Sequence, residues 1–254
     1  MRLRVLGCSG GELPHHRTTC FLLGARLAVD AGALTASLSL PELMRVDDVV
    51  LTHGHLDHVK DVPLVADLLA GRRRRPIRIH ASTACARSLR QDVFNDRLWP
   101  DFTRIPDRRR PIIEIRPFAP SRPFRAGAFR FQPIPVEHTV ESVGFVVSDG
   151  RGAIAISGDT GPSDRLWAAV NRVERLRALL VECSFPNALQ GLAARSGHLT
   201  PATLAGELAK LDGAGIPILL YHLKPAHEAR LRREVAALRR GDVRVLADGD
   251  RFTF

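Results

Sequence analysis

The segment His53-Gly54-His55-Leu56-Asp57-His58 places three imidazoles and one carboxylate within six residues, directly after an apolar run. Neutral imidazole and carboxylate suit Zn²⁺ first, and Mn²⁺ or Fe²⁺ next. Residues two apart on an extended chain point to the same side, so His53 and His55 can hold one ion together. Asp57 and His58 are adjacent and cannot share a face, which suits a second ion. The segment therefore predicts a centre of two divalent metal ions.

Three further candidate ligands follow strand-like runs later in the chain. His138 comes after a run that ends at Val136, Asp159 lies in the turn Ser157-Gly158-Asp159-Thr160, and His222 follows Tyr221. Each stands where a buried strand meets a loop, which is where a scaffold usually places functional groups. Taken singly, each also has a structural interpretation, as a turn carboxylate for Asp159 and as a hydrogen-bonded core histidine for His138 or His222.

Taken together, the order of these residues resembles the metallo-β-lactamase superfamily. The resemblance runs from Gly7-Cys8-Ser9-Gly10-Gly11 to His222 and implies an α/β fold, the four-layer αβ/βα sandwich, with two bound divalent metal ions. It implies that His53, His55 and His138 hold the first ion, that Asp57, His58 and His222 hold the second, that Asp159 bridges them, and that Asp30 supports the ligands from behind.

No cysteine stands in place of Asp159, which points away from the lactam-cleaving members and fits the branch of phosphodiesterases and nucleases. Three segments resemble the class II 3′,5′-cyclic nucleotide phosphodiesterases: 94–102, 181–187 and 196–201. This resemblance implies a metal-dependent hydrolase that converts a small anionic phosphodiester, cyclic AMP or cyclic GMP, to the nucleoside 5′-monophosphate.

Four residues are candidates for catalysis or substrate contact. His198 precedes the helix start Thr200-Pro201, whose free amides favour a phosphate nearby, and similar histidines in the superfamily contact the scissile phosphate. His198 is therefore the expected proton donor, with a surface histidine as the alternative. Asp57 is expected to orient the attacking water while it ligates. Trp99 and Phe102 are candidates for covering the nucleotide, with an aromatic anchor inside a loop as the alternative.

Three other functions fit parts of the same pattern. A tRNA 3′-processing endonuclease of the RNase Z type shares the expected metal set, and the formal charge of +10 favours a nucleic-acid partner. Its extended tRNA-binding arm has no obvious counterpart, because residues 104–125 are short and rich in proline. Another small cyclic phosphodiester is a second alternative. A metal-stabilised nucleic-acid-binding protein without catalysis is the third, although structural zinc rarely needs seven ligands.

Composition bounds the remaining properties. The 254 residues, 45% apolar and 25% charged, predict one globular domain over residues 1–254. No apolar stretch approaches the roughly 20 residues that span a bilayer, and no signal peptide is evident, so a cytoplasmic protein without a membrane partner is expected.

The four scattered cysteines are predicted to be reduced packing residues. The arginine runs 72–75 and 108–110 are interpreted as solvated loops in preference to phosphate sites. The sequence is compatible with a homodimer but does not predict one.

Alternating strand and helix patterns must position these side chains. Strands are predicted at 3–6, 19–23, 27–30, 46–51, 77–80, 112–116, 129–136, 143–147, 153–156, 178–182, 217–221 and 243–246, and helices at 62–69, 83–93, 164–171, 201–211 and 228–239. Ser82 and Ser163 are predicted to cap two of the helices. Residues 104–125 are predicted to form an inserted loop or hairpin over the site. Interspersed helices suggest two sheets covered on their outer faces.

Overall fold

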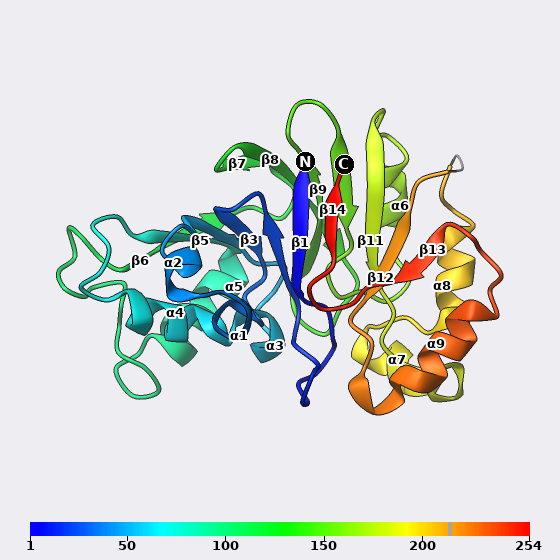
Figure 1. Ribbon diagram of the computed structural model, residues 1–254, viewed down its shortest axis with the longest axis horizontal. Coiled ribbons are helices and arrows are strands. Elements are labelled where there is room, and N and C mark those ends of the chain that lie inside the picture. The colour runs from blue at the N-terminus through cyan, green and yellow to red at the C-terminus, as the bar shows by residue number, and fades with distance from the viewer. Residues whose placement is uncertain (213–214) are drawn as a thin grey trace.

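Two seven-stranded sheets pack face to face in the computed structural model, which describes residues 1–212 and 215–254 (Figure 1). In spatial order, the first sheet consists of β14 (Arg251–Thr253), β1 (Arg2–Gly7), β2 (Cys20–Leu23), β3 (Leu27–Val29), β4 (Asp48–Val50), β5 (Ile77–Ser82) and β6 (Ile113–Phe118). The second consists of β13 (Val243–Val245), β12 (Ile218–Tyr221), β11 (Leu176–Glu182), β10 (Ala153–Ile156), β9 (Ser142–Ser148), β8 (Phe129–Val136) and β7 (Phe124–Ala126).

Helices cover the outer face of each sheet. The first sheet is flanked by α1 (Leu34–Ser37), α2 (Leu40–Leu43), α3 (Leu56–Val59), α4 (Asp61–Leu69), α5 (Thr83–Ser88) and the π-helix η1 (Leu89–Val93). The second is flanked by α6 (Asp164–Val170), α7 (Gln190–Ser196), α8 (Pro201–Leu208) and α9 (Glu228–Ala236), with short 3₁₀ turns η2 (Asn187–Leu189) and η3 (Pro225–His227). The predicted four-layer αβ/βα sandwich is confirmed.

Burial follows these layers. One apolar cluster lies between the first sheet and its helices, one between the two sheets, and one between the second sheet and its helices. The inter-sheet cluster contains Phe131 and Phe145, whose rings meet edge to face at 5.5 Å, and the fully buried Tyr221. Because both sheets contribute to this shared core, we propose that residues 1–254 form one domain, as the composition predicts. No helix among the described residues has the length and apolar character needed to cross a membrane.

Several local predictions need correction. The helix predicted over residues 83–93 is α5 followed by a π-helix, although Ser82 does cap it by accepting a hydrogen bond from the amide of Cys85. Ser163 precedes α6 but makes no capping bond, and its buried hydroxyl finds no partner. Helices α8 and α9 end three residues earlier than predicted, at Leu208 and Ala236.

Residues 104–112, the first part of the segment 104–125 that was predicted to cover the site, do not lie over it. Strand β6 lies inside this segment and pairs in parallel with β5, so that Ile113 lies opposite Ile77. The loop before β6 is therefore at the amino end of these strands. The loops that carry the candidate metal ligands leave from the carboxyl ends, so residues 104–112 lie at the opposite edge of the sheet.

Asp48 forms a buried electrostatic cluster within the first sheet. Its carboxylate accepts hydrogen bonds from Arg78 Nε at 2.7 Å and from His80 Nε2 at 2.8 Å, and the side chain is 2% exposed. Burial alone would raise the pKa of Asp48, but these bonds outweigh burial and lower it from 3.8 to about 2. A shift of this size corresponds to ~2 kcal/mol of stability.

Replacing Asp48 with asparagine is expected to lower the free energy of unfolding by about 2 kcal/mol at pH 7. Because the folded-state pKa is depressed, this contribution is present above about pH 4 and disappears as the pH falls towards 2. Urea denaturation of wild type and Asp48→Asn between pH 7 and 3 tests this, with the exposed Asp92→Asn as control. Equal stability of Asp48→Asn and wild type at pH 7 would refute the assignment.

Candidate metal centre

The candidate ligands lie on four segments that each follow the carboxyl end of a strand, with Asp57 and His58 in helix α3 and the others in loops. Residues 53–58 follow β4, His138 follows β8, Asp159 follows β10 and His222 follows β12. Strands β8, β10 and β12 run in the same direction within the second sheet, so their carboxyl ends open on one edge. The edge where parallel strands end is the usual position of a site in such sheets. Here it brings together residues as far apart as 53 and 222.

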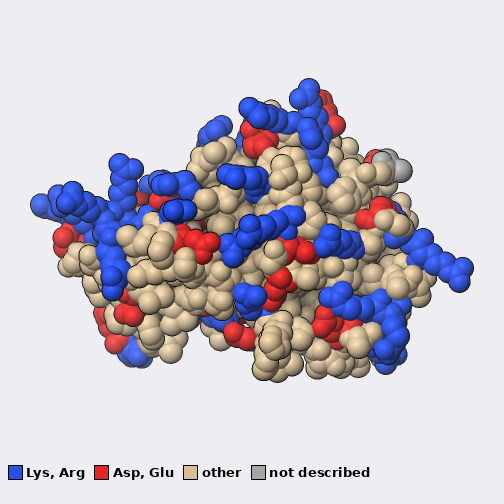
Figure 2. All heavy atoms as spheres, viewed as in Figure 1, with Lys and Arg blue, Asp and Glu red and all other residues tan. Residues whose placement is uncertain are grey.

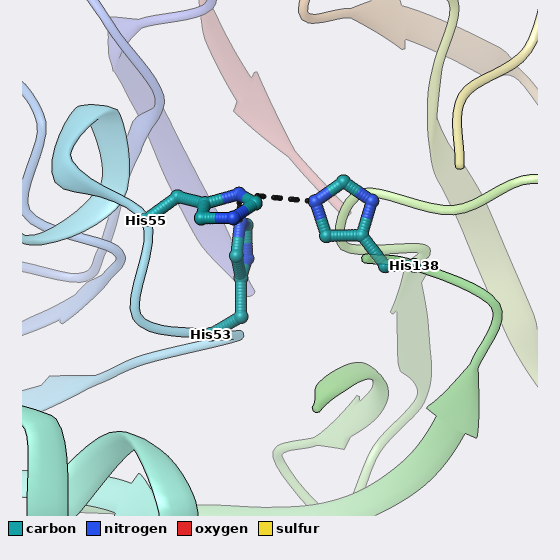
Figure 3. Close-up of side chains that lie close together, drawn as sticks. All are labelled: His53, His55 and His138. Atoms are coloured by element: carbon teal, nitrogen blue, oxygen red, sulfur yellow. Dashed lines mark hydrogen bonds between the residues drawn. The ribbon is translucent and has the colours of Figure 1, made fainter. Parts of the chain in front are cut away.

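The first cluster consists of His53, His55 and His138 (Figure 3). The Nδ1 atom of His55 is 3.1 Å from the Nε2 atom of His53 and 3.1 Å from the Nε2 atom of His138. The three ligand atoms lie within 4.8 Å of one another. Two residues come from the loop after β4 and the third from the facing sheet, so the cluster forms only where the two sheets meet.

The second cluster consists of Asp57, His58 and His222. The Nε2 atom of His222 is 3.4 Å from the Nε2 atom of His58 and 3.3 Å from an oxygen of Asp57. Asp159 lies between the two clusters. Its Oδ2 atom is 3.1 Å from His222 Nε2, 3.3 Å from His58 Nε2 and 3.9 Å from His53 Nε2. The structure thus groups the seven residues in the arrangement that the resemblance implies.

Groups behind the clusters fix the orientation of the imidazole rings. His58 Nδ1 donates to Asp30 Oδ2 at 2.8 Å, and His138 Nδ1 donates to the carbonyl of Gly197 at 2.9 Å. His222 Nδ1 lies 2.9 Å from the hydroxyl of Ser184. With Nδ1 occupied in this way, each ring presents Nε2 to the centre. Such outer hydrogen bonds are characteristic of metal-ligating histidines.

Two glycines allow the backbone to approach these rings closely. At Gly10 a Cβ atom would lie 2.5 Å from the His222 carbonyl oxygen, and at Gly197 it would lie 2.8 Å from the Cα atom of His138. Gly197 also has a φ of 65°, in the left-handed region that favours glycine. Asp30 adopts a φ of 58°, which is uncommon for a residue with a side chain. The local backbone is therefore shaped around the clusters.

The charges of the centre fit divalent cations. Asp159 is 1% exposed, and its Oδ1 atom is buried without a hydrogen-bond partner. Burial would raise the pKa of Asp159, but His222 and His58 lower it well below its usual value. Burial also lowers the pKa of His53 well below 6.5, which keeps that imidazole neutral. Burial would lower the pKa of His58, but Asp159 and Asp30 outweigh it and raise the pKa well above 6.5, so this ring must release a proton when it binds a metal ion. The neutral imidazole of His53, the ionised carboxylate of Asp159 and its oxygen without a partner suit a metal ion directly.

His198 lies beside the clusters and has its own carboxylate partner. It is 7% exposed, and its ring stacks on that of His222 with centroids 5.3 Å apart. Its Nδ1 atom lies 2.7 Å from Oε1 of Glu182, which is fully buried at the end of β11. Burial alone would lower the pKa of His198, but Glu182 outweighs it and raises the pKa. His198 can therefore carry a proton next to the metal ligands.

Glu182 and Ser184 are functional candidates to which sequence reasoning assigned no role. Glu182 accepts hydrogen bonds from the Thr160 amide at 3.1 Å and from the Ser184 hydroxyl at 2.7 Å. The same serine hydroxyl contacts His222, so one network holds both His198 and His222. An acidic residue directly after the apolar run Ala178 to Val181 was the available signal.

The predicted substrate contacts of Trp99 and Phe102 are not supported. Phe102 is 4% exposed within the core between the first sheet and its helices, and its carbonyl accepts from the amide of Ile113. It therefore lies at the amino end of β6, away from the metal ligands. Trp99 packs half-buried against the same core, and its Nε1 atom is enclosed without a partner. Both rings fit the alternative role of loop anchors.

Comparison with known proteins agrees with this geometry. The family model described as the β-lactamase superfamily domain matches residues 26–222. The chain belongs to the metallo-β-lactamase superfamily. The crystal structure of the metallo-β-lactamase fold protein YhfI from Bacillus subtilis superposes with a TM-score of 0.79 at 21% identity, covering 99% of each chain. Because the chain belongs to this superfamily and carries these clusters of histidine and aspartate side chains, the protein is a metal-dependent hydrolase that binds divalent metal.

Some relatives in the superfamily have names that describe a substrate. A probable 3′,5′-cyclic-nucleotide phosphodiesterase of Yersinia pestis is 26% identical over 211 residues, which are 72% of this chain and 58% of that protein. This chain thus spans little more than half of that relative. A ribonuclease Z of Bradyrhizobium is 26% identical over 310 aligned positions, covering 98% of both chains.

Proposed function

We propose that this protein is a dinuclear metal-dependent phosphodiesterase that hydrolyses 3′,5′-cyclic nucleotides to nucleoside 5′-monophosphates. The observation that carries the proposal is the hydrogen bond between His198 and the buried Glu182 beside two clusters of metal-ligating side chains. A phosphodiester needs negative charge neutralised at phosphorus and a proton supplied to the departing oxygen. The seven ligands serve the first requirement, and His198 serves the second.

The chain's own residues have distinct roles in this reaction. His53, His55 and His138 would hold one ion, Asp57, His58 and His222 the other, and Asp159 would bridge them. Bound divalent ions supply Lewis acidity and lower the pKa of water towards neutrality. Asp57, which is also a ligand, would orient the attacking water. His198 would donate its proton to the leaving O3′, and Glu182 would hold the imidazole in place for that transfer.

Zinc is the metal that we propose for both positions, because imidazole and carboxylate suit it well, with manganese and iron as the alternatives. Asp30 would act through His58 by fixing its tautomer. We place the enzyme in the cytoplasm, as the composition predicts, since its four cysteines are buried free thiols.

A tRNA 3′-processing role is the second candidate, because the ribonuclease Z relative aligns along nearly the whole chain. The cyclic nucleotide is favoured because three segments resemble the class II cyclic nucleotide phosphodiesterases and because residues 104–112 form no arm above the metal ligands. A different small cyclic phosphodiester would require the same groups. A purely nucleic-acid-binding protein would have no need of a proton donor paired with a buried glutamate.

The substrate assignment is tested with the purified protein loaded with zinc or manganese. We expect conversion of 3′,5′-cyclic AMP to 5′-AMP, loss of this activity with EDTA, and recovery when metal is restored. Precursor tRNA with a 3′ trailer and 2′,3′-cyclic AMP serve as comparison substrates. Trailer cleavage without cyclic AMP hydrolysis would move the protein to the tRNA-processing branch. Nucleic-acid binding that survives EDTA, without any hydrolysis, would favour the binding protein.

A further inference from the structure

A cationic hollow lies at the far edge of the first sheet from the metal ligands. The two arginine runs interpreted above as separate solvated loops meet there, around a hollow of about 990 Å³. Six arginines line it: Arg73, Arg74, Arg75, Arg108, Arg109 and Arg110. The same end of the molecule carries a dense group of Lys and Arg side chains (Figure 2). We call this feature the arginine hollow.

Most of the charge in the arginine hollow is uncompensated. The guanidinium group of Arg73 already has partners within the protein, since it pairs with Asp47 at 2.7 Å and donates to the carbonyl of Met44. The other five guanidinium groups form no ion pair with any carboxylate in the described part of the chain, residues 1–212 and 215–254. Glu114, the one acidic lining residue, is paired with Arg116. Five like charges around one concavity repel one another until an anion neutralises them.

The lining also defines the kind of anion. Guanidinium groups bind phosphate oxygens through paired charge-assisted hydrogen bonds, and several of them around one hollow suit a ligand with several phosphates. Pro76, Pro106 and Pro111 restrict the two loops, which reduces the entropy lost on binding. The lining residues include no aromatic side chain on which a base would stack. The recognised group is therefore the phosphate chain.

The arginine hollow is too far from the metal centre to hold the same small substrate. The loop 71–76 enters β5 at its amino end, whereas the loop 53–58 follows the carboxyl end of the neighbouring parallel strand β4. Six residues of extended chain span about 20 Å, and a cyclic nucleotide is shorter than that. The arginines converge on a concavity, which fits a compact ligand better than the extended path of a nucleic-acid backbone.

We propose that the arginine hollow is a second binding site, separate from the metal centre, for a compact ligand that carries a chain of two or more phosphates. Inorganic polyphosphate and a nucleoside polyphosphate share this chemistry. The site does not depend on the reaction catalysed at the metal centre.

Isothermal titration of the metal-loaded protein with inorganic tripolyphosphate, ATP, orthophosphate and a 20-nucleotide single-stranded RNA tests the proposal. The double variant Arg74→Glu/Arg109→Glu is compared with Arg165→Glu/Arg233→Glu, an equal change of charge at exposed arginines outside the hollow. The metal ligands are intact in all three proteins, so phosphate binding or chelation at the metal centre contributes equally. Metal content and thermal unfolding are measured to verify this.

We expect the first double variant to bind tripolyphosphate at least about tenfold more weakly than wild type, because two charge-assisted contacts are lost, while the second stays within about twofold. ATP bound as tightly as tripolyphosphate would identify a nucleoside polyphosphate as a source, and weaker ATP binding would favour inorganic polyphosphate. Equal weakening in both double variants would show general charge attraction and overturn the proposal. Loss of RNA binding alone would overturn it in favour of a nucleic-acid surface.

Discussion

Replacing His198 with alanine is expected to lower kcat by about 10²- to 10⁴-fold while both metal ions stay bound. His198 lies outside the two histidine clusters, although it is close enough to His138 and Asp159, and to Glu182 and His222, to form further groups that could hold a metal ion. It stacks on His222 and has a raised pKa, which suits a proton donor. The function that we expect the variant to lose is the proposed proton donation to the leaving oxygen. Steady-state kinetics beside metal analysis by mass spectrometry measures both quantities. Loss of metal with unchanged activity per bound ion would contradict the catalytic role.

Glu182→Gln provides the matched control for this prediction, because it keeps the size of the side chain and removes its charge. Glu182 holds the pKa of His198 above its usual value, so activity should fall as the pH rises through that pKa. Without the charge the pKa of His198 drops, and the decline should begin at lower pH in Glu182→Gln. A purely structural role for Glu182 would reduce activity equally at every pH. An unchanged pH profile would show that Glu182 does not act through His198.

Replacing Asp159 with alanine is expected to remove at least one metal ion and to abolish hydrolysis. One oxygen of Asp159 lies between the two histidine clusters, and the other is buried without a partner, so the carboxylate is available to ions on both sides. Removing the carboxylate takes a ligand atom and a negative charge away from both ions, so the remaining imidazoles bind them more weakly. Metal-to-protein ratios after dialysis, together with the rate of cyclic AMP hydrolysis, measure the effect.

Two further variants make the Asp159 result interpretable. Asp159→Asn keeps the volume of the buried side chain and loses only the charge, so it should also lose metal while its circular dichroism matches wild type. Asp92→Ala changes an exposed aspartate and should keep full metal occupancy and activity. If Asp159→Ala and Asp159→Asn both retain two ions, the bridge is misplaced.

Predictions from local sequence succeeded where one short segment contains the whole signal. The strands that precede Asp159 and His222 were identified because buried strands with a parallel neighbour form continuous apolar runs. Strand β8, before His138, was identified from alternating polar and apolar residues, which suit its antiparallel neighbours. The cap by Ser82 is a similarly local contact, between residues three apart in the chain. The missing cap at Ser163 shows the limit, since tertiary packing buries that hydroxyl without a partner.

The sequence by itself determined the types of donor, their order along the chain and their positions at strand ends, because these depend on local chain geometry. Only the tertiary structure decided which distant groups meet. Glu182 with His198 and Asp30 with His58 are pairs of this kind. It also decided that Phe102 is buried at the amino end of β6 and that two separate arginine runs enclose one hollow. Such contacts depend on sheet order and strand direction, which a single sequence does not encode in any one segment.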